Sequence, residues 1–169
     1  IPAYLVGLFI VYHQDVIPQE IEHYFHYLFS MVALIIVLLA FTERRFVRMS
    51  WLLVIMTHFW IALAVAFNER FSFDQIHIYL SGIAIAGSIG FLMIQLLRNQ
   101  EGRLDLNMFH GHSYKHPKFA ILFLLCCLGI SGFPISPTFI GEDLIFTHVH
   151  EDQPVLAFVI ALCFIIDGL

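Results

Sequence analysis

The sequence has few charged residues. Asp, Glu, Lys and Arg make up 12% of it, while 60% of its residues are hydrophobic. A water-soluble domain of 169 residues could not bury so much apolar surface in its core. The shortage of charge therefore argues against an ordinary soluble protein. Basic residues interleaved with exposed aromatic residues are also missing, which argues against nucleic acid as a partner.

The motifs of common soluble enzymes are missing as well. HExxH, GxxxxGK[ST] and GxGxxG do not occur, and nothing resembles a nucleophilic triad. The three cysteines lie inside apolar stretches, where a thiol acts as a small hydrophobic group. His110 and His112, and again His148 and His150, have a spacing that can serve a metal, but we interpret them, with His116, as solvated loop histidines. We therefore predict no catalytic centre of its own, no metal site and no cofactor.

Long apolar stretches are abundant instead. There are six, and the middle four run about 18 to 22 residues, the length with which a helix crosses a hydrocarbon core of about 30 Å. The first and last look cut short, so we interpret the chain as a piece of a longer polypeptide. We predict an all-α, polytopic transmembrane bundle of about six spans, in a single domain over residues 1–169. The stretches are Ile1–His13, Tyr24–Phe41, Met49–Phe67, Ile76–Leu97, Phe119–Ile140 and Val155–Leu169.

Basic residues fall in every second gap between these stretches. The gaps Thr42–Arg48 and Arg98–Lys118 hold seven of the eight Lys and Arg residues, and the other gaps hold only Arg70. Because basic loops stay on the cytoplasmic side, we expect these two gaps inside and the others outside. The chain is thus predicted to be a multi-pass protein of a bacterial or organellar inner membrane, with the lipid bilayer as its surroundings.

Two of the stretches contain glycine or proline residues that are unusual inside a helix. The fourth carries Gly82, Ala86 and Gly90 on one helical face, which lets neighbouring helices approach closely in lipid. The fifth is interrupted in GISGFPISP, where proline removes a backbone donor and clashes with the preceding turn. We interpret it as either a kinked structural helix or a discontinuous helix beside a transport route. The interrupting residues are Gly129, Gly132, Pro134 and Pro137.

A few titratable residues lie in or beside the apolar stretches. His58 is at the centre of the third stretch, and imidazole can pass a proton between its two nitrogens near neutral pH. It is either a histidine bonded to a neighbouring helix or a member of a proton path. His77 is either an interfacial capping residue or a second relay member. Glu142 follows the broken helix, and Asp167 lies near the end of the chain; an intramembrane carboxylate is a functional candidate by default.

Three segments resemble the antiporter-like membrane subunits of respiratory NADH:quinone oxidoreductase and the related Mrp Na⁺/H⁺ antiporters. They are AFTERRFVRMSWLLVIMTHFW, QIHIYLSGIAIAGSIGFLM and GISGFPISPTFIGEDLIF. The resemblance implies a larger subunit of about 14 helices in two inverted repeats, with broken helices at its proton channels. This chain would be a fragment that contains the second repeat.

The resemblance also implies roles for single residues. Glu142 matches an acidic or lysine residue of the outlet channel, and His77 matches the first histidine of the central helix. Ser81 and Ile85 stand where that helix has a second histidine and a lysine, and Arg48 falls at or near a basic site that is usually lysine. A guanidinium keeps its proton and Ile85 has none, so the chain departs from the family at two positions of proton shuttling.

The leading hypothesis is therefore a proton-conducting subunit of a multi-subunit membrane complex, related to the NADH:quinone oxidoreductase. The predicted relay residues are His58, His77, Glu142 and Arg48, with water between them. Other membrane subunits and a cytoplasmic protein are the expected partners, and H⁺ or Na⁺ the ion. A cation/proton antiporter, or an inorganic-carbon uptake pair with a zinc protein resembling carbonic anhydrase, fits too. An alternative hypothesis, of a different functional class, is a structural membrane anchor that does not conduct protons.

Overall fold

The computed structural model describes residues 2–13, 19–67, 73–102, 104–109, 111–149 and 153–168. All regular structure in this part of the chain is helical, as the sequence predicts. Three helices begin at a proline that follows a short connection, because proline at the first helical position loses no hydrogen bond. The helices are α1 (Pro2–Tyr12), α2 (Gln19–Thr42), α3 (Val47–Ala66), α4 (Phe73–Glu101), α5 (His112–Lys115), α6 (Pro117–Ile130), α7 (Pro137–Val149) and α8 (Pro154–Asp167).

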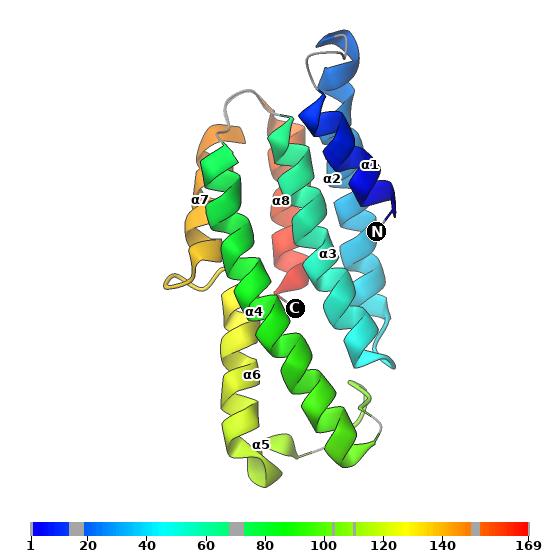
Figure 1. The fold of residues 1–169 in the computed structure, drawn as a ribbon, viewed down its shortest axis with the longest axis vertical. Helices are drawn as coiled ribbons and strands as arrows, with labels where there is room; N and C mark the ends of the chain where they lie inside the picture. The colour runs from blue at the N-terminus through cyan, green and yellow to red at the C-terminus, as the bar shows by residue number, and fades with distance from the viewer. Residues whose placement is uncertain are drawn as a thin grey trace.

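The helices form an up-and-down bundle in which successive long helices run in opposite directions (Figure 1). α2, α3 and α4 follow its long axis, and α6 and α7 follow one another along α4. α8 packs against α2, α3 and α7. Among the described residues, α2, α3 and α4 are each long and apolar enough to cross a membrane, whereas α6 and α8 are shorter apolar helices. The prediction of a polytopic helical membrane bundle is confirmed.

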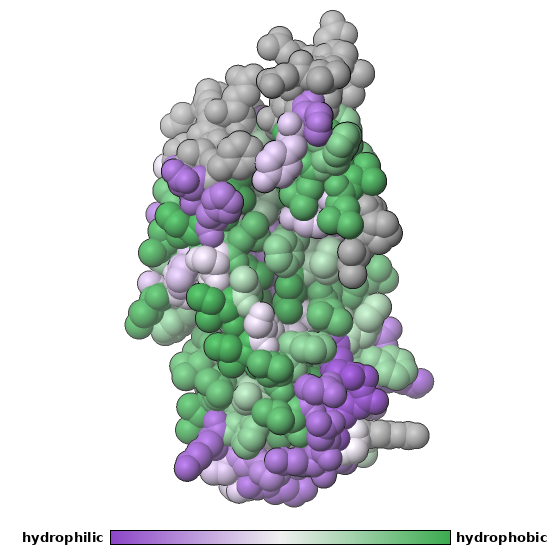
Figure 2. Space-filling view, viewed as in Figure 1, coloured by the Kyte–Doolittle hydropathy of each residue, from purple (hydrophilic) through white to green (hydrophobic). Residues whose placement is uncertain are grey.

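The outer surface of the bundle is apolar over its middle, and hydrophilic residues gather towards its lower end (Figure 2). On α2, for example, Leu28, Ile35 and Leu38 point outward with about half of their surface exposed. Such a surface is stable only against lipid or other apolar protein, because it would be costly in water. The inner sides of α2, α3 and α8 meet instead in a core that contains Ala33 and Ile160.

The two basic gaps meet at the lower end of the bundle. The turn between α2 and α3 and the segment after α4 are joined by a backbone hydrogen bond, from the amide of Leu106 to the carbonyl of Arg44, at 3.0 Å. The ends of α1, α3 and α7 and the beginnings of α2, α4 and α8 lie at the opposite end (Figure 1). The segregation of basic residues in the sequence thus corresponds to one end of the folded bundle.

The fifth predicted stretch forms two helices, α6 and α7, separated by residues 131–136. α6 ends in a Schellman motif: Gly132 adopts a φ of +67°, and the amide of Phe133 donates to the carbonyl of Leu128 at 3.0 Å. α7 begins at Pro137, and the hydroxyl of Ser136 accepts from the amide of Phe139 at 3.2 Å. Both broken ends are therefore capped locally, at a depth where the freed backbone groups need partners.

The structure places the end of this span further along the chain than the sequence analysis did. The apolar stretch was predicted to end at Ile140, but α7 continues to Val149. Glu142 thus belongs to α7 and not to the loop that follows this helix. Hydropathy placed the end of the span too early, because it counts a charged residue as polar even when its side chain turns inward. His148 also lies within α7, and not in the predicted loop.

α4 approaches α6 and α7 at its small residues. A Cβ atom on Gly82 would lie 2.7 Å from the backbone nitrogen of Thr138 in α7. One turn later, a Cβ atom on Gly129 of α6 would lie 3.0 Å from the Cβ atom of Ala86. Backbones at this distance gain dispersion contacts that replace the hydrophobic drive absent in lipid. α4 therefore holds both halves of the broken span.

The contact between α4 and α3 centres on a tryptophan. The indole ring of Trp51 packs directly on Gly90. A Cβ atom at position 90 would overlap with this ring, so only glycine fits there. Its Nε1–H donates to the carbonyl of Gly87 at 2.9 Å. This bond satisfies the one polar group of a side chain that is otherwise apolar. The glycines of α4 thus also fix the register of α3.

The backbone of α7 also comes very close to that of α4 at Gly141. A Cβ atom there would lie 2.6 Å from the Cα atom of Tyr79, a backbone atom that cannot move aside. We expect Gly141→Ala to lower the free energy of unfolding by about 1–3 kcal/mol, the usual cost of overpacking. Thermal unfolding in detergent measures it.

Gly87→Ala is the matched control. The added methyl group would meet only the end of the Ile55 side chain, at 2.9 Å, and that side chain can rotate. Because alanine also favours a helix by about 1 kcal/mol over glycine, we expect a small net change. An equal loss of stability in both variants would contradict the proposed packing.

Candidate functional site

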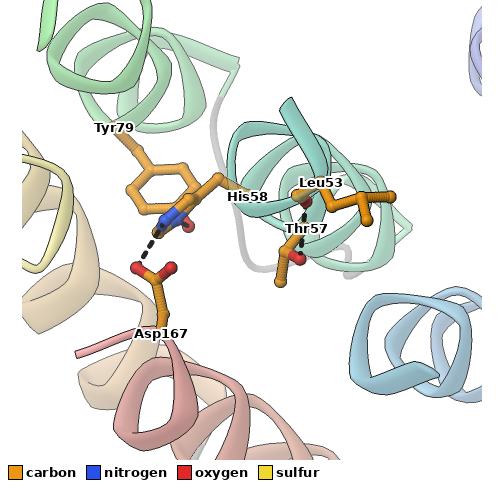
Figure 3. A network of polar contacts seen from close by, with 5 residues as sticks. All are labelled: Leu53, Thr57, His58, Tyr79 and Asp167. Atoms are coloured by element: carbon orange, nitrogen blue, oxygen red, sulfur yellow. Dashed lines mark hydrogen bonds and ion pairs between the residues drawn. The ribbon is translucent and has the colours of Figure 1, made fainter. Parts of the chain in front are cut away.

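The interior of the bundle contains a histidine with partners on both ring nitrogens. His58 of α3 is fully buried, and its Nδ1 atom lies 2.7 Å from the hydroxyl of Tyr79 on α4. Its Nε2 atom lies 3.0 Å from Oδ2 of Asp167 at the end of α8. Figure 3 shows the imidazole between the two side chains, each from a different helix. We call Tyr79, His58 and Asp167 the polar triad.

The chemistry of the three groups sets the direction of the hydrogen bonds. An ionised carboxylate can only accept, so with Asp167 charged the hydrogen of a neutral imidazole lies on Nε2. Nδ1 is then an acceptor, and the Tyr79 hydroxyl donates a hydrogen bond to it. The triad is therefore a directed row of hydrogen bonds, from the phenol through the imidazole to the carboxylate. A histidine that takes a proton on one nitrogen can release one from the other.

The side chains of the triad are almost completely buried. The Tyr79 residue is 1% exposed, and the carboxyl side chain of Asp167 is 2% exposed. The ring of Phe164, one turn before Asp167, stacks on the imidazole at an interplanar angle of 24°. Phe146 of α7 meets the edge of Phe164. Aromatic rings thus exclude bulk water from one side of His58, which strengthens the electrostatic interactions within the triad.

Asp167 is not fully committed to His58. Its second oxygen, Oδ1, is buried and has no hydrogen-bond partner in the described part of the chain. A carboxylate oxygen has more than one lone pair to offer, and burying one without a donor is costly. The hydroxyl of Thr138, at the first turn of α7, is in the same situation among the described residues. Two polar groups near the helix break therefore keep acceptor capacity that the fold does not use.

Glu142 lies against the helix break. A Cβ atom on Gly132 would come within 2.7 Å of the carboxyl carbon of Glu142, so the carboxyl group occupies the space that a side chain at position 132 would fill. Its charge interacts with His58 and with Asp167. The neighbouring Asp143 points outward and is exposed. Only one of the two consecutive acids thus faces the triad.

Of the four predicted relay residues, His58 and Glu142 lie within range of an electrostatic interaction. His77 is exposed, because it is two residues from Tyr79 and therefore on nearly the opposite side of α4. Arg48 donates to the side-chain oxygen of Gln95 at 3.1 Å. It is ten residues from His58 on α3, about 15 Å along the helix axis. Roles for His77 and Arg48 in a relay stay predictions.

Two residues of the triad were not assigned to the relay from the sequence. Tyr79 looks like any other tyrosine near a helix start, and nothing local predicts that its hydroxyl meets His58. Asp167 stands out as an acid in the apolar run CFIID, and that signal was available, but its partner is 109 residues away along the chain. Only the packing of α8 against α3 joins them.

The histidines of the loops give no metal site in the described residues. His116 precedes α6, and its Nε2 atom lies 3.6 Å from Oε1 of Glu101. His112 lies in α5, and His110 and His150 fall outside the described residues. No group of three His, Cys, Asp or Glu side chains that could hold a metal ion occurs where the structure is described.

An apolar helical bundle with a discontinuous span and a buried, hydrogen-bonded polar row defines a multi-pass integral membrane protein. Residues 3–166 match the family described as "NADH:quinone oxidoreductase/Mrp antiporter, TM", and the chain belongs to this family. The resemblance found in the sequence is thus confirmed.

A curated relative is NADH-quinone oxidoreductase subunit N of Cytophaga hutchinsonii, which is 28% identical over 75 residues. This match covers 44% of the chain and 16% of that subunit, so the chain corresponds to a small part of the relative. No solved structure matches.

The triad gives a prediction about stability. Tyr79→Phe removes the hydroxyl and leaves the buried Nδ1 atom of His58 without its partner, so we expect the free energy of unfolding to fall by about 1–3 kcal/mol. Tyr114→Phe removes a hydroxyl from a side chain on a residue that is 86% exposed and is the matched control. Thermal unfolding of both variants compares them, and an unchanged midpoint for Tyr79→Phe would show that the hydrogen bond is absent.

Proposed function

We propose that this chain is part of a proton-conducting subunit of a multi-subunit membrane complex, and that the polar triad carries protons through it. The observation that carries the proposal is the row of hydrogen bonds from Tyr79 through His58 to Asp167, buried in an otherwise apolar bundle. A polar row of this kind is expensive in a membrane protein, and intramembrane ionisable groups usually mark an ion or proton path.

The transfer itself follows from the geometry. When Nδ1 of His58 accepts the hydroxyl proton of Tyr79, the imidazolium releases its Nε2 proton to Asp167. Tyr79 regains a proton from the next donor, and the carboxylic acid passes its proton on. The imidazole then carries its hydrogen on Nδ1, so a second transfer in the same direction requires the ring to rotate about its Cβ–Cγ bond or to exchange that hydrogen with water. Each transfer itself moves one proton over a hydrogen bond of 2.7 or 3.0 Å. Histidine suits this task because both of its forms are accessible near neutral pH.

Glu142 extends the path towards the helix break. Its carboxyl group interacts electrostatically with both His58 and Asp167, and it lies on Gly132 where α6 and α7 separate. Protonating either carboxylate would relieve the repulsion between the two, so a proton could pass through this pair. We propose that water connects Glu142 to the triad, since a broken helix in a membrane is tolerated where it borders protein or a hydrated cavity.

The complex around this subunit is part of the proposal. The named relative is a subunit of an NADH-quinone oxidoreductase. We propose that other membrane subunits and a cytoplasmic protein provide the driving reaction. The transported ion is proposed to be H⁺, since histidine and the two carboxyl groups exchange protons.

Neutral variants of the two carboxyl groups test the proposal. Glu142→Gln and Asp167→Asn keep the shape of each side chain but can no longer exchange a proton. In the assembled complex in sealed vesicles, we expect each to slow proton translocation by roughly 10²-fold, the lower end for losing a positioned proton-transfer group. Acidification of the vesicle lumen, followed with a pH-sensitive dye, measures it.

Asp143→Asn is the matched control, because it removes an exposed acid next to Glu142 in the same helix turn. We expect it to translocate protons like the unmodified complex. Full translocation by Glu142→Gln and Asp167→Asn, with the complex still assembled, would instead support a structural anchor that does not conduct.

A further inference from the structure

The lower end of the bundle has an open cavity that the proposed proton path does not use. It has a volume of about 890 Å³ and lies between the beginning of α3, the end of α4 and the segment after α4. Figure 2 shows a hydrophilic patch over the same ends of α3 and α4. We call it the basic cavity, because three arginines line it: Arg45, Arg48 and Arg98.

The charges of the basic cavity are unbalanced. Three arginines face two carboxylates, Glu43 and Asp105, and Asp105 already accepts from the backbone and side-chain amides of Asn107. Within the described residues, the guanidinium groups of Arg45 and Arg98 make no ion pair and no hydrogen bond. A guanidinium offers five N–H donors in a planar fork that matches a phosphate or a carboxylate. The cavity therefore has unused donors for an anionic group.

The polarity of the cavity wall changes with depth in the same way on both helices. Arg45 lies in the turn before α3, and Leu52 lies five residues inside that helix, towards the bundle centre. On α4, Phe91 is seven residues from Arg98 in the same direction. Seven residues correspond to about 10 Å along a helix. Charged donors thus lie at the end of the bundle, and an apolar wall that includes Leu52 and Phe91 lies nearer to its centre.

We propose that the basic cavity binds an anionic phospholipid. Its phosphate group would lie between Arg45 and Arg98, and one acyl chain would run along Leu52 and Phe91. The charge is complementary, and the depth at which the wall becomes apolar corresponds to the boundary between headgroups and hydrocarbon. Basic pockets between transmembrane helices on the cytoplasmic side are suited to such headgroups. A free phosphate ion would use the arginines but not the apolar wall.

The test compares lipids in the full-length protein. The protein is placed in nanodiscs of phosphatidylcholine with or without phosphatidylglycerol, and retained lipids are counted by native mass spectrometry after gentle activation. We expect one phosphatidylglycerol molecule to be retained in preference to phosphatidylcholine. The double substitution Arg45→Gln and Arg98→Gln should reduce this retention roughly tenfold or more, because it removes the charge-assisted hydrogen bonds to the phosphate.

Lys115→Gln with Lys118→Gln is the matched control, because it removes two exposed positive charges from the same end but outside the basic cavity. Retention should then be unchanged; an equal loss would reveal a general surface attraction and overturn the proposal. Leu52→Gln leaves the arginines in place and should also reduce retention, which keeps the test valid if the arginine variant does not fold. Equal retention of both lipids, or displacement of phosphatidylglycerol by millimolar inorganic phosphate, would overturn the lipid site. Loss of proton conduction does not bear on this result.

Discussion

The hydrogen bonds of one buried imidazole hold together helices that are far apart in the sequence. His58 on α3 contacts Tyr79 on α4 and Asp167 on α8, and each of these contacts must form for the others to be buried without cost. In an apolar bundle an unpaired ring nitrogen or carboxylate is destabilising by several kcal/mol, so the triad selects one relative placement of the three helices. The glycine contacts between α4 and α7 then fix the position of α7, and with it the position of Glu142 beside the helix break.

Most of the fold could be predicted from the sequence, because in a membrane the solvent imposes simple rules. A helix must satisfy its own backbone, and it must be long and apolar enough to cross the bilayer. The stretches predicted from Tyr24, Met49 and Ile76 correspond to α2, α3 and α4. The break between Gly129 and Pro137 was predicted from local preferences. Gly132 adopts a positive φ after the end of α6, and Pro137 is the first residue of α7.

The candidate site could be predicted only in part. His58 and Glu142 were identified because a titratable residue in an apolar run is costly and needs an explanation. Tyr79 was not assigned, since its importance comes from a contact between helices and not from its neighbours in the chain. The end of α7 was also missed, because a window of hydropathy treats Glu142 as the start of a loop whichever way its side chain points. Local composition, in short, predicts which groups are buried but not which groups meet.

The capped ends of α6 and α7 have a mechanical consequence. Each half of the span is a complete unit, since Gly132 and the Leu128–Phe133 bond close the first and Ser136 caps the second. Tilting α7 as a rigid rod about the connecting residues would therefore rupture no bond within either half. The acid on its second turn would swing with that rod. The range of such a tilt is set by the close contacts of α7 with α4 at Gly82 and Gly141.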